Sequence, residues 1–214
     1  KGLYITKKRY AALIYDLEGV RHDVDGKPGK VKAMGLDLKR SDTPVFVQDF
    51  LSEILMMVLQ GKGETEVLEE ITNFREEFKS RPGWEKGSPK RANNMTKYTE
   101  AEEKQGRANM PGHVRASMNW NRLLKMYSDK HSKPLVDGSK VVVCKLKSNP
   151  LQYTSVAYPV DQLRVPEWFK ELPFDHDAME ESIINAKLDN LIGVLNWNLI
   201  ATQENNTFNA LFEF

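Results

Sequence analysis

Apolar residues return every three or four positions in two successive parts of the chain, over residues 47–59 and 67–78. This spacing is the period of a helix with one buried face. Thr43-Pro44 stands before the first run as an N-cap hydroxyl followed by a proline, and Gly61 follows the run. We therefore predict a pair of amphipathic helices, the second over about residues 64–79 with a solvated acidic face.

The same spacing predicts two further helices and one short helical turn. Residues 112–128 contain one apolar set at helical spacing. A longer set begins after Asp175 and continues to Trp197, and we expect this helix to close the helical domain. A brief turn at Pro166 is predicted between them.

Strand-like patterns occur at the start of the chain and again in its second half. In Ile5–Tyr15, apolar, β-branched and aromatic residues flank three consecutive cations, which predicts a strand. Val31–Leu38 is expected to return beside it, giving a β-hairpin with a long loop. Residues 140–146 and 155–158 are expected to form a second antiparallel pair. Together with the helices, these elements predict an α+β fold.

The first predicted strand carries the first candidate chemistry. Because side chains alternate between the faces of a strand, Lys8 and Tyr10 would share one face and Lys7 and Arg9 the other. A lysine beside a tyrosine suits a polyanion, since the ammonium supplies charge and the phenol supplies a flat surface with a hydroxyl donor. The alternative is an edge strand kept soluble by its lysines.

Helical and strand periodicity both disappear over residues 81–111, so we predict a long loop there. A loop of this length in a compact domain is typically functional or disordered. It is rich in cations and amides, the residue types that contact phosphate oxygens in protein–DNA complexes. An ordinary solvated loop is the alternative. The candidate contacts, including two residues at the start of the next helix, are Lys90, Arg91, Asn93, Asn94, Lys97, His113 and Arg115.

Composition narrows the class of protein. Of the 214 residues, 29% are charged and 40% hydrophobic, as in a globular chain, and no apolar run is long enough for a membrane span. The net charge of +1 conceals a balance of −7 over residues 161–214, so the rest of the chain is basic. The four histidines show no metal-ligand spacing, and Cys144, the single cysteine, is expected to be a buried structural thiol.

The chain ends in an apolar peptide after a polar stretch. Phe208, Leu211 and Phe212 have helical spacing, and Phe214 is the last residue. Such a peptide fits a partner's groove, although it could also fold back on the chain's own core. The sequence contains no phosphate-binding glycine loop, no serine elbow and no closely spaced aspartates after a predicted strand. The residues alone therefore indicate a basic, nucleic-acid-binding chain with a C-terminal docking peptide.

Several of these segments, in order, resemble family B DNA polymerases. Lys7-Lys8-Arg9-Tyr10 is similar to the K-K-R-Y segment that follows the catalytic aspartates in the palm. Met34-Gly35-Leu36-Asp37 is similar to the passage from palm to thumb. Residues 92–98, 113–115 and 119–121 resemble the thumb of T-even-like phage polymerases, and residues 208–214 resemble their clamp-binding tail, with Asn209-Ala210 as a departure.

The resemblance implies a palm hairpin over residues 1–40, a mainly helical thumb with a small antiparallel β element over 41–200, and a flexible tail over 201–214. It implies duplex DNA contacts by the basic residues, with Lys8 and Tyr10 in the minor groove, where correct base pairs present similar acceptors. The implied DNA-binding set is Lys7, Lys8, Arg9, Tyr10, Lys90, Arg91, Asn93, Asn94, Lys97, His113 and Arg115. The implied clamp-binding set is Phe208, Leu211, Phe212 and Phe214.

The family's catalytic aspartates, fingers and exonuclease domain have no counterpart in this sequence, so no catalytic or metal-binding residue is expected here. The resemblance implies Mg²⁺ for the complete polymerase only. The implied partners are primer-template DNA, the N-terminal remainder of the polymerase and a sliding clamp, with no membrane, in the cytoplasm of an infected bacterium. We expect a fragment, or the smaller part of a polymerase encoded in two pieces. The alternatives are a non-catalytic accessory protein that tethers DNA to a clamp, and a purely structural interaction domain.

Overall fold

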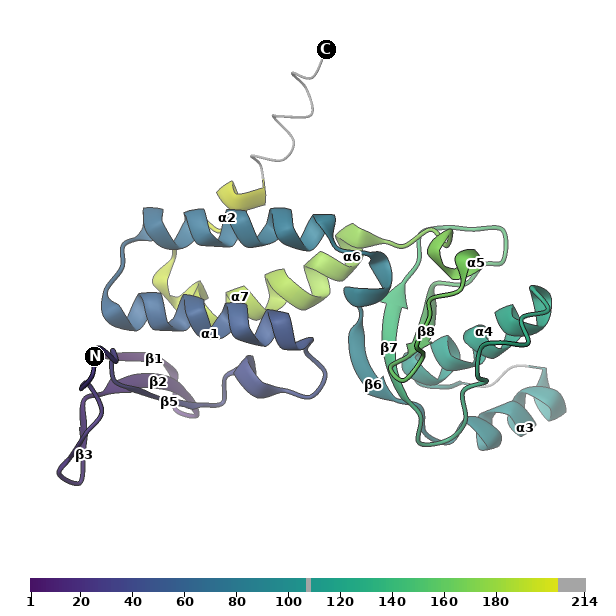
Figure 1. The fold of residues 1–214 in the computed structure, drawn as a ribbon, viewed down its shortest axis with the longest axis horizontal. Helices are drawn as coiled ribbons and strands as arrows, with labels where there is room; N and C mark the ends of the chain where they lie inside the picture. Colours follow the sequence, from purple (N-terminus) through teal and green to yellow (C-terminus); the bar gives the residue numbers. More distant parts are fainter. Residues whose placement is uncertain (107–108, 204–214) are drawn as a thin grey trace, which may run out of the picture. The chain divides into compact units, whose positions relative to one another are not determined.

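The computed structural model describes residues 1–106 and 109–203, and they form two compact units. Unit 1 contains Lys1–Arg40, Val45–Ser80 and the chain from Ile184 onward, and unit 2 contains Ser41–Pro44 and Arg81–Ile183. Each unit has helices and an antiparallel sheet (Figure 1), so the α+β class is confirmed. The functional division at residues 40 and 200 stays a prediction.

The sheet of unit 1 has three antiparallel strands in the order β1-β2-β5. They are β1 (Gly2–Thr6), β2 (Arg9–Ile14) and β5 (Lys30–Met34), with a small hairpin of β3 (Asp16–Leu17) and β4 (Val20–Arg21) between the last two. The single strand predicted over residues 5–15 is wrong, because the chain reverses at Lys7 and Lys8. No glycine, proline or asparagine marks this reversal in the sequence.

The two faces of this sheet differ in burial. Ala11 and Leu13 of β2 are buried and belong to the hydrophobic core of unit 1, which also contains α1. Tyr10 and Ala12 alternate with them and are half-buried on the other face. The prediction that Tyr10 and Ala12 share one face of a strand is confirmed. Lys7 and Lys8 lie in the turn before β2, so the predicted alternation does not extend to them.

Gly35 fixes the turn between β1 and β2 from the end of β5. Its φ of 68° lies in the left-handed region, and a Cβ atom at this position would lie 2.1 Å from the Lys8 carbonyl oxygen. Only glycine allows this approach, because any side chain would push the Lys8 backbone away. The glycine therefore permits β5 to end against the Lys8 backbone in the turn.

Helices complete the described part of unit 1. They are α1 (Val45–Gln60), α2 (Glu64–Ser80) and α7 (Ala186–Ile192), together with the 3₁₀ turns η1 (Asp37–Lys39) and η4 (Gly193–Leu195). The helix pair predicted for α1 and α2 is confirmed, and Phe50 stacks on Phe74 between them with ring centroids 3.7 Å apart. Arg75, which is buried, donates to Thr202 Oγ1 (2.9 Å) and so ties the last described residues to α2.

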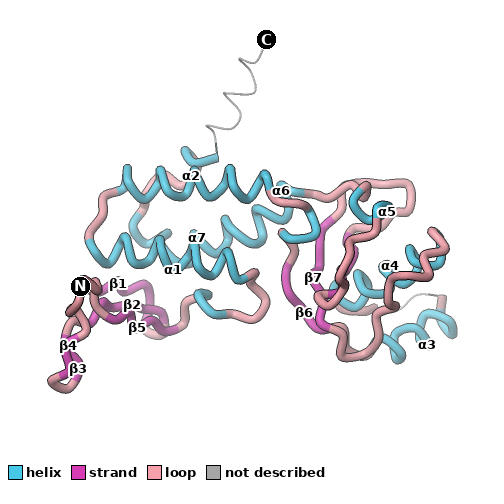
Figure 2. The backbone as a smooth tube through the Cα atoms, viewed as in Figure 1, coloured by secondary structure: helices cyan, strands magenta, loops and turns pink. Residues whose placement is uncertain are grey.

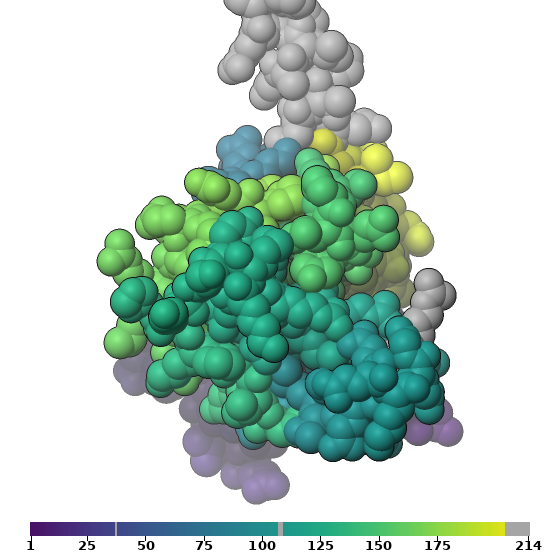
Figure 3. Space-filling view, turned by 90° about the vertical axis from the view of Figure 1, so that its right-hand side faces the viewer, coloured from purple at the N-terminus to yellow at the C-terminus, as the bar shows by residue number. Residues whose placement is uncertain are grey.

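The sheet of unit 2 has the strand order β6-β7-β8. Figure 2 shows β6 and β7 of this sheet side by side in magenta. The elements are η2 (Gly83–Glu85), β6 (Ser88–Arg91), α3 (Met95–Gln105), α4 (Gly112–Met126), β7 (Lys140–Lys145), β8 (Ser155–Pro159), α5 (Glu167–Lys170) and α6 (His176–Glu180). Helix α4 packs against β8 and β7. In Figure 3, residues coloured teal and green, which belong to this unit, form the surface that faces the viewer.

The long loop predicted over residues 81–111 is wrong, since it contains β6 and α3. Strand β6 has the sequence Ser-Pro-Lys-Arg and no apolar alternation, so its pairing with β7 places it in the sheet. Helix α3 buries only Met95, and therefore shows no apolar stripe. Its Glu, Ala, Lys and Gln residues have high helix propensity, which was the signal available in the sequence.

The other predicted elements of unit 2 are confirmed: α4, the pair β7–β8 and the short α5. Helix α6 begins where predicted, with the Asp175 side chain accepting a hydrogen bond from the Ala178 backbone N–H (3.0 Å). The predicted long helix is divided, because Glu181–Asn185 has π-helical hydrogen bonding between α6 and α7.

Helix α4 supplies the core of unit 2. Trp120 is fully buried, contacts Tyr158 and Phe169 edge-to-face, and donates from Nε1 to the Lys133 carbonyl oxygen (3.0 Å). Its two neighbours also bind backbone groups: Asn119 donates to the Ser155 carbonyl oxygen (2.9 Å). Asn121 Nδ2 donates to the carbonyl of Leu135 (2.8 Å), while its Oδ1 accepts from that residue's N–H (2.7 Å).

Two buried ionisable side chains, Lys86 and Cys144, lie near the start of β6. Lys86 precedes β6 in the sequence, and Cys144 belongs to β7, the strand that pairs with β6. Lys86 is fully buried with Nζ 2.8 Å from His176 Nδ1, and burial lowers the lysine pKa to about 8, against the opposing effect of Glu180 and Asp177. Burial raises the pKa of the Cys144 thiol to about 12, so the expected buried thiol is confirmed. Among the described residues, no helix meets the length and apolarity needed to cross a membrane.

We predict that Gly35→Ala destabilises unit 1 by roughly 3 kcal/mol or more, from the positive φ and the displaced Lys8 backbone together. Gly26→Ala is the matched control, because Gly26 also has a positive φ, 75°, but no atom within 4 Å of the added Cβ. It should cost about 1 kcal/mol. Urea unfolding of the two variants measures the difference, and equal losses would contradict the close approach.

Candidate nucleic-acid interface

The first candidate cluster lies on the open face of the unit 1 sheet and at its turn. Lys7 and Lys8 occupy the turn between β1 and β2, and both are exposed. Tyr10 stacks on Tyr4, its partner across the strand pair, with ring centroids 6.1 Å apart and planes inclined by 25°. Tyr4 is 75% exposed. The turn thus presents two ammonium groups beside a pair of aromatic rings.

The third cation of this segment has a different environment. The Arg9 guanidinium donates to the backbone carbonyl oxygen of Asn190, near the C-terminal end of α7. A cation at a helix C-terminus is stabilised by the helix dipole. Arg9 therefore contacts α7 within unit 1, and the DNA contact that the resemblance implies for it stays a prediction.

The second candidate cluster lies in unit 2, around the end of β6. Two of its cations belong to this strand, the amides follow it, and the rest lie in the first turns of α3 and α4. All of these side chains are exposed except the half-buried His113. The residues that the chain brings into this region are Lys90, Arg91, Asn93, Asn94, Lys97, His113 and Arg115.

The N-terminus of α3 is already occupied by a carboxylate. Asp137, in the turn before β7, accepts hydrogen bonds from the Met95 backbone N–H (2.5 Å) and from Thr96 Oγ1 (3.3 Å). Asn94, at the N-cap position, has a left-handed backbone with φ of 60° and makes no side-chain cap hydrogen bond. The Met95 backbone N–H and the Thr96 hydroxyl are thus already bound at the start of this helix.

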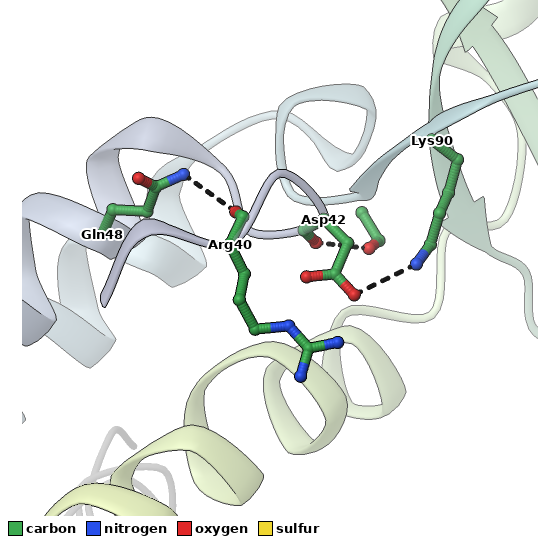
Figure 4. Close-up of polar contacts among 5 residues, drawn as sticks. Arg40, Asp42, Gln48 and Lys90 are labelled. Carbon is green, nitrogen blue, oxygen red and sulfur yellow. Dashed lines mark hydrogen bonds and ion pairs between the residues drawn. The ribbon is translucent and has the colours of Figure 1, made fainter. Parts of the chain in front are cut away.

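Lys90 forms an ion pair within unit 2. Its Nζ lies 3.2 Å from Asp42 Oδ2, and Figure 4 shows this contact between the two labelled residues. Ser88 Oγ donates to the Asp42 carbonyl oxygen (2.6 Å). An exposed ion pair contributes about 0–1 kcal/mol, so a phosphate could replace the carboxylate at small cost. Burial, and then the charge of Lys90, lowers the pKa of His113. His113 is thus favoured in its neutral form.

Like charges face each other across the β6–β7 pair. Arg91 and Lys140 are partners in the register, at the end of the strand pair next to the Asn93-Asn94 loop. Like charges directly opposite each other destabilise a sheet, and an anion between them would relieve the repulsion. Lys140 therefore belongs to the second cluster, although sequence reasoning did not include it.

Sequence reasoning missed Tyr4 and Lys140 for the same reason. Both become neighbours of predicted residues only through strand pairing, Tyr4 with Tyr10 and Lys140 with Arg91. Recognising a reversal at Lys7 would have placed Tyr4 beside Tyr10. No local pattern in the sequence gives the register of β6 with β7.

The described residues contain no group of three or more histidine, cysteine, aspartate or glutamate side chains that could hold a metal ion. The predicted clamp-binding residues, Phe208, Leu211, Phe212 and Phe214, lie outside the described residues.

Comparison with known proteins agrees with the resemblance noted in the sequence. The family profile described as "DNA polymerase family B" matches residues 1–110. Over 159 residues the chain is 32% identical to the DNA-directed DNA polymerase of Enterobacteria phage T4 and 34% identical to that of Escherichia phage RB69. The matched region covers 74% of this chain and 17% of each relative. The chain thus spans only a small part of the length of these relatives.

One conclusion follows from the ordered sequence landmarks, the family match and these identities. This chain belongs to DNA polymerase family B and is similar to a part of the T-even phage enzymes.

Proposed function

We propose that this chain is the C-terminal part of a DNA-directed DNA polymerase and that it grips primer-template duplex behind the active site. The observation that carries the proposal is the exposed Lys7–Lys8 turn beside Tyr10, in a chain whose first 110 residues match the family B profile. In this proposal residues 1–40 are the end of the palm, 41–200 the thumb and 201–214 a tail.

The turn fits the minor groove near the primer terminus. Its two lysines are exposed, and a lysine ammonium carries three hydrogen-bond donors and no acceptor. The minor groove presents similar acceptors for correct pairs whatever the sequence, so such donors test pair geometry without reading the bases. Tyr10 adds a hydroxyl donor, and its stack on Tyr4 restricts the position of the ring. Arg9 supports this arrangement from within the fold.

The second cluster would hold the duplex through its backbone. Arg91, Lys97 and Arg115 are exposed, and their side chains form no ion pair with any other described residue. Each can therefore neutralise a phosphate and release counterions, which gives a grip that is independent of sequence and sensitive to salt. The amides of Asn93 and Asn94 would add neutral donors.

The remaining partners lie outside the described part of the chain. The metal-binding carboxylates and the nucleotide site would come from the N-terminal remainder of the polymerase, which would bind Mg²⁺ and perform the transfer reaction. The peptide from Phe208 to Phe214 would dock in the groove of a sliding clamp, an assignment that rests on its sequence alone. The setting would be a bacterium infected by the phage.

A second candidate is a non-catalytic accessory protein that binds DNA and tethers it to a clamp. It shares the exposed basic clusters and the C-terminal peptide, and it requires no polymerase N-terminal part. The two candidates differ in one outcome: only a polymerase part converts DNA binding into primer extension when the remainder is added.

We predict that Tyr10→Ala, in the reassembled polymerase, lowers kcat/KM for extension about tenfold, equivalent to about 1.4 kcal/mol, and reduces discrimination against mismatches. Tyr10→Phe retains the ring on Tyr4 and removes only the hydroxyl, so it separates the donor from the stack. Single-turnover primer extension measures both variants, and urea unfolding of the chain controls for stability. Unchanged extension and fidelity in Tyr10→Ala would contradict the minor-groove role.

We also predict that Phe212→Ala weakens clamp binding by about 2 kcal/mol or more, roughly thirtyfold in Kd, because a buried aromatic anchor dominates such interfaces. Asn205→Ala, in the polar stretch before the peptide, is the matched control and should leave the affinity unchanged. Isothermal titration of the chain with the clamp measures both. If Phe212→Ala changed the Kd for the clamp by no more than the experimental error, Phe212 would not be a clamp anchor. Packing of this residue on the chain's own core would then be favoured.

A further inference from the structure

A groove lies at the C-terminal end of α4 in unit 2, in a region that the duplex contacts do not use. Its main cavity has a volume of about 580 Å³, within the range of small-ligand sites. A second hollow of about 410 Å³ adjoins it and shares Ser128, Asp129 and Ser132 with it. We name the two together the α4–α5 groove. Its walls are the loops 128–134 and 161–166, and its floor is aromatic.

The floor consists of two stacked rings. Tyr127, at the end of α4, lies on Trp168 of α5 with ring centroids 4.9 Å apart and planes inclined by 11°. The tyrosine is 46% exposed, so part of its surface remains open to a ligand. Leu163 on the opposite wall is fully exposed. A flat aromatic surface with an apolar neighbour is suited to stacking of a planar ring.

Hydrogen bonds hold both walls in place. The Asp129 carboxylate accepts from the Ser132 hydroxyl (2.8 Å) and from Trp168 Nε1 (2.9 Å), and also from two backbone N–H groups of its own loop. Gln162 Nε2 donates to Ser132 Oγ (3.1 Å) and to the Arg164 carbonyl oxygen (3.2 Å), which links one wall to the other. These hydrogen bonds form within the chain without a ligand, so the groove is preorganised.

The charges around the groove favour an anion. Lys125, Lys130, Lys133 and Arg164 line it, all are exposed, and none forms an ion pair with a described residue. Three carboxylates, those of Asp129, Asp161 and Glu167, also line the groove. That of Asp129 is engaged by four hydrogen-bond donors, and that of Glu167 pairs with Lys170 (2.9 Å). Four cations therefore line the groove against three carboxylates, and Lys170 beside Glu167 adds a further positive charge.

We propose that the α4–α5 groove binds single-stranded nucleic acid, with a base stacked on Tyr127 and phosphates beside Lys133 and Arg164. Aromatic platforms next to cations bind single strands with little sequence preference, because every base has a π-face. A duplex hides its base faces and could use only the cations. An acidic aromatic peptide has similar chemistry, and the experiment below separates it from a nucleic acid.

The groove is separate from the proposed duplex contacts. Helix α4 has 15 residues, so its two ends are about 20 Å apart at 1.5 Å per residue. His113 and Arg115 lie at one end and Tyr127 follows the other. The inference does not rest on the duplex grip, and the two binding modes can be measured and can fail independently.

The test uses the full chain and two fluorescein-labelled probes, single-stranded dT12 and a blunt 12-base-pair duplex. We expect Tyr127→Ala to weaken dT12 binding about tenfold, as for the loss of one stacked base, and to leave duplex binding within twofold. Tyr127→Phe keeps the π-face and should bind dT12 like the unaltered chain. Arg164→Gln should reduce the salt dependence of dT12 binding, whereas Lys104→Gln, an exposed lysine of α3 outside the groove, should not.

Trp168 provides a second readout, since a base stacked beside Tyr127 should quench tryptophan fluorescence in the unaltered chain and not in Tyr127→Ala. Three results would overturn the proposal. They are dT12 binding that is insensitive to Tyr127→Ala, equal losses for dT12 and duplex, and displacement of dT12 by an acidic phenylalanine-containing peptide that binds more tightly. Near-UV circular dichroism and the Tyr127→Phe variant show whether a loss reflects misfolding instead of a lost stack.

Discussion

The close approach of Gly35 to the Lys8 carbonyl is the constraint on which the first candidate cluster depends. Only glycine at position 35 lets β5 end against the turn between β1 and β2, in which the two lysines are exposed. The same reversal places Tyr4 opposite Tyr10, where the two rings stack. A position that admits no side chain thus permits the arrangement in which two lysines lie beside two stacked rings.

The cations of this chain fall into two groups according to their surroundings. Some serve the fold: Arg9 donates to a carbonyl of α7, Arg75 ties the end of the described chain to α2, and Lys86 is buried beside His176. Others are exposed at turns, strand ends and first turns of helices, with Arg91 set opposite a second cation. Neither Arg91 nor Lys140 forms an ion pair with another described residue, so their repulsion is a cost to folding that a phosphate would reduce. Net charge alone, at +1, would not have indicated a polyanion partner.

The sequence predicted the elements that carry their own periodicity. Helices α1, α2 and α4 have an apolar stripe, and β7 has a run of valines, so their bounds were nearly right. The sequence analysis missed two elements that have no periodicity of their own. Strand β6 has no apolar alternation and is defined by its pairing with β7, and helix α3 buries a single methionine. The residues of the second cluster were predicted from type alone, whereas Lys140 needed the register of a sheet. The aromatic floor of the α4–α5 groove joins residues 41 positions apart, a contact that no local pattern reveals.

The central claim is that this chain grips duplex DNA through phosphate contacts as part of a polymerase. The most direct test is the salt dependence of primer-template binding by the chain, compared with a variant in which Arg91, Lys97 and Arg115 are all glutamine. Each phosphate contact contributes about 0.9 to the slope of log K against log salt, so the account predicts a slope shallower by about 2 to 3 in the variant. Absence of duplex binding at low salt, or the same slope in both proteins, would contradict it.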